Sequence, residues 1–197
     1  MLRRSFPSDG FKEAPQRLSV SRPVPSDALY LAFPMSDRLS PDYSVYDLIS
    51  DLLSNGNSSR LYLDLVKDRH LFTEVNAFVL GDVGPGLLVI NGKLVEGTSI
   101  EDGETAIWDS LRSLTEREVD RHELDKVLNK FESNFVYSQY KAIDRAMSLC
   151  YYEWLGQIDW VGNEPDRYRN TTPADVLRVA RQTFLPNNCY TLEYRKL

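Results

Sequence analysis

Hydrophobic residues along the chain follow two different periods, and each change of period marks a predicted element. A compact apolar run covers residues 28–33 and stops at Pro34, which is typical of a strand buried on both faces. Residues 71–80 and 86–95 are rich in Val, Phe, Ile and Thr. A loop rich in Gly, Pro and Asp separates these two runs, so they predict a β-hairpin. Residues 189–194 predict a closing strand.

Apolar residues spaced three and four apart predict helices over most of the remaining chain. The first is expected to begin at Ser40 and Pro41 and to end at Gly56, and a second, short helix follows from Ser58 or Ser59. Helical sequence resumes over residues 100–114, and Thr115 with Glu118 fits a capping box that would open the next helix. A last helix opens at Thr172 and Pro173.

Two of these helices carry apolar stripes that we expect to face the core. The helix after Thr115 has its stripe at Leu124, Val127, Leu128, Phe131 and Phe135. The following helical segment has its stripe at Ile143, Met147, Cys150 and Trp154.

The order of elements predicts the fold class. Strands joined by helices and one hairpin favour an α+β fold, with a mixed, mostly antiparallel sheet and helices packed on one face. Residues 26–197 are interpreted as a single domain. Residues 1–25 hold four prolines and are interpreted as a lead-in or linker remnant.

Charge and hydropathy exclude several classes of protein. The 197 residues carry a formal net charge of −6, which argues against nucleic-acid binding because that affinity comes from clustered Lys and Arg. The longest aliphatic run, residues 87–90, is far too short for a membrane span. The N-terminus has no apolar segment typical of a signal peptide. These features favour a cytoplasmic protein, and a periplasmic or organellar location stays open if the chain is a fragment.

Residues able to carry out catalysis are scarce. The two histidines, His70 and His122, lack the paired spacing of a zinc motif, and Cys150 and Cys189 are too few for a four-ligand zinc site. We therefore expect no catalytic residue, no metal ligand and no cofactor in this chain.

One pair of residues suggests a binding role. Arg145 and Tyr152 are seven positions apart, so on a helix they would lie on one line, about 10.5 Å apart along the axis. The stripe that contains Met147 would lie on the opposite side, so we expect Arg145 and Tyr152 to face away from the core. A guanidinium and a phenol held in line can grip the carbonyl or carboxylate groups of an extended peptide. An ordinary solvent-facing pair is the alternative.

Residues 24–197 resemble the C-terminal, non-catalytic domain of the insulinase-like (pitrilysin-type) zinc metallopeptidases. The resemblance lies in the order and intervals of several short segments, none of them diagnostic alone. These are the strand at residues 29–34, the helix at 42–53, the Gly56-x-Ser58-Ser59-Arg60-Leu61 turn, Thr115-x-x-Glu118, Glu123 to Val127, Arg145 with Tyr152, and Tyr168 to Val176.

The resemblance implies a function for the chain. In this family two halves close over an unfolded peptide, and zinc is held by an inverted His-x-x-Glu-His motif in the N-terminal half, a motif that this sequence lacks. The Arg-x6-Tyr pair of the C-terminal half is associated with substrate binding, and Arg145 and Tyr152 match it. The implied function is the substrate-binding half of a zinc endopeptidase. Its zinc would belong to a catalytic half in the same polypeptide or in a partner chain.

The implied partners are this catalytic half and an unfolded peptide, and a homodimer is also considered. The alternative function is a non-peptidase assembly subunit that keeps the same fold. The Arg145 and Tyr152 pair favours the peptidase half, because an assembly subunit has no need of it.

Overall fold

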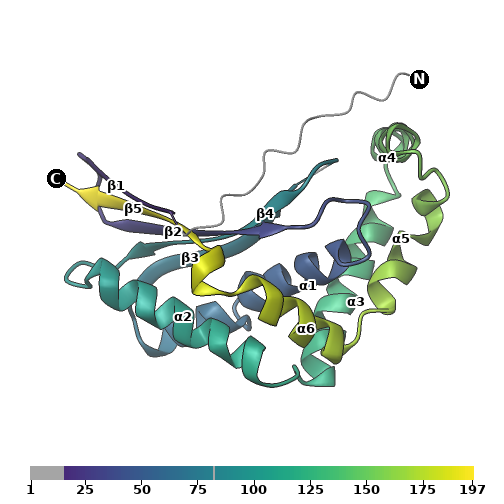
Figure 1. Ribbon diagram of the computed structural model, residues 1–197. Coiled ribbons are helices and arrows are strands. Elements are labelled where there is room, and N and C mark those ends of the chain that lie inside the picture. Colours follow the sequence, from purple (N-terminus) through teal and green to yellow (C-terminus); the bar gives the residue numbers. More distant parts are fainter. Residues whose placement is uncertain (1–15, 82) are drawn as a thin grey trace.

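The computed structural model describes residues 16–81 and 83–197, which form one five-stranded sheet with helices on one side (Figure 1). The strands lie in the order β1-β5-β2-β4-β3. Strand β1 pairs in parallel with β5, and every other pairing is antiparallel. The strands are β1 (Gln16–Arg22), β2 (Ala28–Met35), β3 (Phe72–Leu80), β4 (Gly86–Leu94) and β5 (Tyr190–Lys196). The α+β fold with a mostly antiparallel sheet is thus confirmed.

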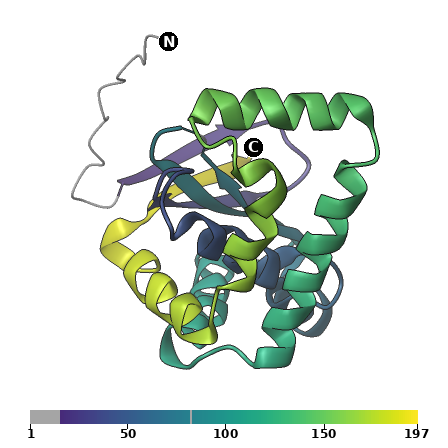
Figure 2. The same ribbon diagram turned by 90° about the vertical axis from the view of Figure 1, so that its right-hand side faces the viewer.

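Helices fill the intervals between the strands. They are α1 (Tyr43–Ser54), the π-helix η1 (Tyr62–Asp68), α2 (Ile100–Glu116), α3 (Arg121–Ser138), α4 (Ala142–Leu155), α5 (Trp160–Arg169), α6 (Pro173–Thr183) and the 3₁₀-helix η2 (Pro186–Asn188). Helices α1, α2 and α6 cover one face of the sheet, and α4 lies at one end of the molecule, above the level of the sheet (Figures 1 and 2).

The burial pattern of strand β2 shows that helices cover only one face of the sheet. Leu29, Leu31 and Phe33 are buried, whereas Tyr30 and Ala32 between them are only half-buried. Side chains alternate between the two faces of a strand, so the first set packs under the helices and the second set lies on the uncovered face. The prediction of a strand buried on both faces is therefore wrong for this chain, because the described residues supply no second helical layer.

The uncovered face of the sheet is apolar. The strand register places on it Leu18, Tyr30, Ala32, Phe78, Leu80, Leu87, Val89, Tyr190 and Leu192. A shallow groove of about 680 Å³ crosses this face, and its lining includes Leu18, Tyr30, Val89 and Leu192.

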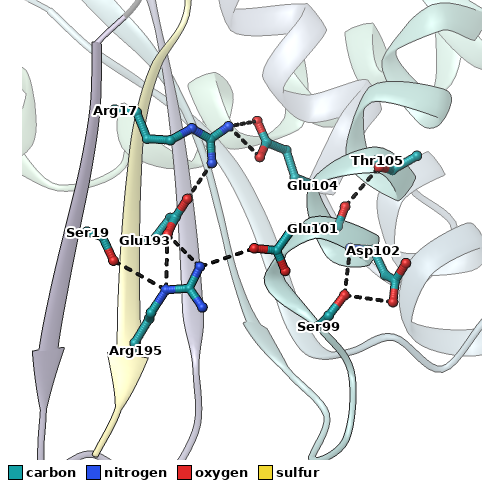
Figure 3. Close-up of polar contacts among 9 residues, drawn as sticks. All are labelled: Arg17, Ser19, Ser99, Glu101, Asp102, Glu104, Thr105, Glu193 and Arg195. Carbon is teal, nitrogen blue, oxygen red and sulfur yellow. Dashed lines mark hydrogen bonds and ion pairs between the residues drawn. The ribbon is translucent and has the colours of Figure 1, made fainter.

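Strand β1 corrects the interpretation of residues 1–25 as a lead-in. Residues 16–22 form a full strand of the sheet, and residues 1–15 lie outside the described residues. Figure 3 shows how the strand is held: Arg17 of β1 binds Glu193 of β5 and, at 2.7 Å, Glu104 of α2. Pairing with the last strand, more than 170 residues away, explains why local sequence did not indicate it.

Helix boundaries agree with the sequence in most places. Thr172 caps α6 and forms a reciprocal capping box with Asp175. Gly56 has a φ of +90°, the left-handed conformation that glycine adopts freely after a helix. The capping box predicted at Thr115 is wrong: α2 continues through Thr115 to Glu116, and α3 begins after its cap Asp120, whose carboxylate accepts from the His122 amide at 2.7 Å.

Candidate functional site

Helix α4 carries both residues that the sequence singled out. It runs from Ala142 to Leu155 and ends at Gly156, whose φ of +73° stops the helix. Arg145 is exposed, whereas Tyr152 is only 5% exposed. The expectation that both would face away from the core is therefore wrong for Tyr152.

The stripe of α4 lies on the opposite side from the one expected. Ile143, Met147 and Trp154 are at least half exposed, and Cys150 is exposed as well. The prediction that this stripe and Tyr152 lie on opposite sides of one helix is confirmed. The side that faces the protein is the opposite one, because the described residues offer polar partners to Tyr152 and leave the stripe exposed.

That polar partner is a buried ion pair. Arg38, in the loop between β2 and α1, pairs with Glu164 of α5, and both residues are more than nine-tenths buried. The phenol of Tyr152 donates a hydrogen bond to Glu164 and accepts one from Arg38 at 3.3 Å. These three residues, here called the Arg38 cluster, join the β2–α1 loop, α4 and α5.

Aromatic rings surround the Arg38 cluster. The guanidinium of Arg38 lies 4.4 Å from the centre of the Tyr43 ring, and that of Arg167 lies 3.7 Å from the centre of the Trp160 ring. Trp160 also meets the ring of Tyr152 edge to face, with 6.4 Å between the ring centres. The cluster is thus enclosed by groups that exclude water while favouring positive charge.

Burial and charge shift the pKa values of the residues around this cluster. Burial opposes the charge of Arg38, but the carboxylate of Glu164 outweighs it and keeps the pKa of Arg38 above its ordinary value. Burial and the neighbouring Arg38 lower the pKa of Arg167. Burial raises the pKa of Asp47, although the hydrogen bond from Tyr168 at 2.8 Å partly offsets the effect.

Sequence reasoning missed Arg38 and Glu164. They are separated from Tyr152 by 114 and 12 positions respectively, and Glu164 lies on α5, a helix that the hydrophobic pattern did not predict. The sequence offers one weak signal for these partners, a tyrosine on a helix that is followed by acidic residues. This combination is common in proteins, so it does not identify a buried ion pair.

No metal site is found within residues 16–81 and 83–197: no group of three or more His, Cys, Asp or Glu side chains is placed to hold an ion. The described residues therefore offer no set of ligands that fits a zinc centre. No helix among the described residues is long and apolar enough to cross a membrane.

Comparison with known protein families assigns the chain to the family that its sequence resembles. Residues 3–131 match the family described as the peptidase M16 inactive domain, the insulinase-like family that the sequence resembles. A search of curated proteins found no significant match.

Solved structures share the fold over nearly the whole chain. A protease from Helicobacter pylori matches with a TM-score of 0.87 and 18% identity, over 99% of this chain and 48% of its own. A peptidase M16 inactive domain from Pseudomonas fluorescens matches with a TM-score of 0.79 and 17% identity, over 93% and 44% of the two chains. A chain of complex III2 from Candida albicans matches with a TM-score of 0.77 and 9% identity, over 91% and 45%. This chain thus spans about half the length of these structures.

Proposed function

The chain belongs to the inactive-domain family of the M16 peptidases, and from this premise we propose that it is the non-catalytic, substrate-binding half of a zinc endopeptidase that degrades unfolded peptides. The catalytic zinc would be held by a separate half, in the same polypeptide or in a partner chain. Two of the matched chains, from Helicobacter pylori and Pseudomonas fluorescens, are about twice as long as this one, which is the length expected when both halves are joined in one polypeptide.

The uncovered face of the sheet supports peptide binding. Its groove of about 680 Å³ is lined mainly by apolar and aromatic side chains, among them Tyr30, Tyr190 and Leu192. Such a surface can take up the apolar side chains of an unfolded peptide with little dependence on sequence. Helices α1, α2 and α6 lie on the other face of the sheet, so a second half closing over this face would enclose the peptide (Figure 1).

Arg145 is the residue through which we propose direct peptide contact. Its guanidinium is exposed on α4, and it can donate two parallel hydrogen bonds to a peptide carboxylate or one to a carbonyl. Tyr152 lies two turns further along the same helix, and its phenol is engaged by Glu164. We therefore assign Tyr152 a positioning role: it fixes the end of α4 and thereby the direction of Arg145.

The single observation that carries the proposal is the exposure of Arg145 on α4. Arg145 and Tyr152 match the family's Arg-x6-Tyr pair, and Tyr152 is held in place by its hydrogen bond to Glu164. The test is Arg145→Ala in the complete peptidase, measured by hydrolysis of a fluorogenic unfolded peptide. Loss of one charged hydrogen bond is worth about 1.5–3 kcal/mol, so kcat/KM should fall by roughly ten- to a hundredfold. Unchanged turnover would remove the proposed role of Arg145.

The matched control is Arg112→Ala. Arg112 is an exposed arginine on α2 that pairs with Asp109 at 3.3 Å, and α2 lies on the covered face of the sheet. This variant should keep full turnover, and both variants should unfold at the wild-type temperature.

The alternative is an assembly subunit without peptidase activity. The likeness to a chain of complex III2 from Candida albicans favours it, although at 9% identity that likeness concerns the fold. Peptide hydrolysis by the complete protein, measured with and without a zinc chelator, distinguishes the two functions. A peptidase loses its hydrolysis when zinc is chelated, whereas an assembly subunit shows no hydrolysis in either condition.

A further inference from the structure

Two guanidinium groups at the Arg38 cluster keep unused hydrogen-bond donors in a buried setting. The Nη1 atoms of Arg38 and Arg167 are both shielded from water, and neither has a hydrogen-bond partner among residues 16–81 and 83–197. Arg38 as a whole is only 8% exposed. A buried charged donor without an acceptor is costly, and most buried polar groups in proteins have a partner. The two Nη1 atoms therefore indicate an acceptor that the described residues do not supply.

The two guanidiniums converge on one loop. Arg38 belongs to the loop between β2 and α1, and Nη2 of Arg167 on α5 donates to the carbonyl oxygen of Ser40 in the same loop at 3.1 Å. Burial and the positive charge of Arg38 both lower the pKa of Arg167. An anion placed between the two arginines would offset this repulsion and accept hydrogen bonds from both Nη1 atoms.

The carboxylates around these arginines are engaged elsewhere. Glu164 accepts from Nη2 of Arg38 and from the phenol of Tyr152. Asp47 accepts from the phenol of Tyr168 at 2.8 Å, and burial raises its pKa, so its charged form is disfavoured. Neither carboxylate contacts the unused Nη1 donors.

A surface pocket of about 290 Å³ reaches Arg167. The charged residues that line it are Arg167, Arg178, Asp42 and Asp175. Arg178 binds both carboxylates, at 2.7 Å to Asp42 and at 3.4 Å to Asp175. Of these four side chains, Arg167 is therefore the one that keeps an unused donor.

We propose that Arg167 and Arg38 bind a small carboxylate ligand that enters through this pocket. A carboxylate suits the site because its two oxygens match the planar, forked donors of guanidinium groups. One oxygen would accept from Nη1 of Arg167 and the other from Nη1 of Arg38. Since Nη1 of Arg167 is shielded, binding requires this guanidinium to turn from the Trp160 ring, 3.7 Å away, towards the pocket. This site is independent of the function proposed above.

Sodium acetate is the probe for the site. Saturation-transfer NMR of the acetate methyl protons, recorded with the complete protein, measures binding directly, and sodium chloride keeps the ionic strength constant. We expect a signal that saturates as the acetate concentration rises, even though chloride is present. The absence of a saturable signal would overturn the proposal, because water would then be the partner of the two Nη1 atoms.

Substitution of Arg167 tests where acetate binds. Arg167→Gln removes a charged hydrogen bond, so the Kd for acetate should rise by about ten- to a hundredfold. Arg169→Gln is the matched control, because Arg169 lies on the same helix, is exposed and pairs with Asp166 at 2.9 Å. The control should keep the wild-type Kd, and an unchanged Kd in Arg167→Gln would overturn the proposal.

A second variant serves if Arg167→Gln fails to fold, as judged by circular dichroism. Arg167→Lys keeps the positive charge and loses the forked donors, so it should also raise the Kd for acetate. An unchanged Kd in this variant would likewise overturn the proposal.

Two sources supply such a carboxylate: free small molecules and the C-terminal ends of peptides. A tetrapeptide with a free C-terminus and its C-terminally amidated form, each added in competition with acetate, distinguish these sources. Displacement of acetate by the free acid alone assigns the site to peptide ends, and displacement by neither form assigns it to free small carboxylates. Equal displacement by both forms would overturn carboxylate recognition.

Discussion

Tyr152 and Trp154 are two positions apart on α4, and their side chains meet different surroundings. The phenol of Tyr152 lies within the Arg38 cluster, whereas half of Trp154 is exposed. Two positions on a helix differ by about 200° in direction, so one side chain meets the body of the protein and the other meets solvent. The cost of changing each residue follows from this difference rather than from its size.

Trp154→Ala should change the free energy of unfolding by less than about 0.5 kcal/mol, because exposed positions contribute little. Its neighbour Leu155 is 4% exposed, and Leu155→Ala should cost about 2–5 kcal/mol. Urea unfolding of the two variants measures both values. A larger loss for Trp154→Ala than for Leu155→Ala would mean that α4 is turned the other way.

Tyr152→Phe removes the hydroxyl that donates to Glu164, and a buried carboxylate oxygen is left without this partner. We expect a loss of about 1–3 kcal/mol in unfolding free energy. Tyr137→Phe is the control, since Tyr137 is exposed and should tolerate the change. Equal stability of the two variants in thermal unfolding would argue against the Arg38 cluster.

At the scale of elements, β1 depends on polar contacts made far along the chain. Glu193 of β5 is buried between Arg17 of β1 and Arg195 of β5, and Arg195 also binds Glu101 of α2 at 3.2 Å (Figure 3). Burial opposes the charge of Glu193, but the two guanidiniums hold its pKa below the ordinary value near 4.5. The edge strand is thus attached by charge as well as by backbone pairing.

This arrangement predicts acid sensitivity. Because the pKa of Glu193 is lower in the folded state, its stabilising effect is complete above the unfolded-state pKa and is lost as the pH falls through the folded-state pKa. Glu193→Gln should be less stable than wild type at pH 7 and should lose less stability between pH 7 and pH 3. Thermal unfolding across this range measures the slopes. Parallel slopes for the two proteins would show that Glu193 does not control this dependence.

At the scale of the whole molecule, the two faces of the sheet differ: helices pack on one face and not on the other. Helices α1, α2 and α6 cover one face of the sheet, and no helix of the described residues lies on the other face, which is apolar (Figures 1 and 2). Ile143, Met147 and Trp154 of α4 are exposed as well. A layered domain normally buries the apolar faces of its sheet. The uncovered face is therefore consistent with a domain that functions as half of a larger assembly.

The proposed function predicts that the chain on its own binds no stoichiometric zinc and hydrolyses no peptide. The described residues offer no set of metal ligands. Elemental analysis of the purified chain, with a peptide hydrolysis assay beside it, measures both properties. Zinc bound at one equivalent with accompanying hydrolysis would contradict the assignment to the non-catalytic half.

The amino-acid sequence was sufficient for features that depend on neighbouring residues. The hairpin of β3 and β4, the capped start of α6 and the turn at Gly56 follow from local periodicity and turn chemistry, as does the alignment of Arg145 with Tyr152 along one helix. Periodicity shows which residues share a face of an element, but not what that face meets.

Tertiary structure decided the remaining features. The strand at residues 16–22 exists through its pairing with the other end of the chain, and Tyr152 is inside because Arg38 and Glu164 converge on it from distant segments. The apolar stripe of α4 is outside because no residue within 16–81 and 83–197 buries it. The physical reason is the same in each case: burial depends on what lies opposite a side chain, and that is settled only when separate segments pack together.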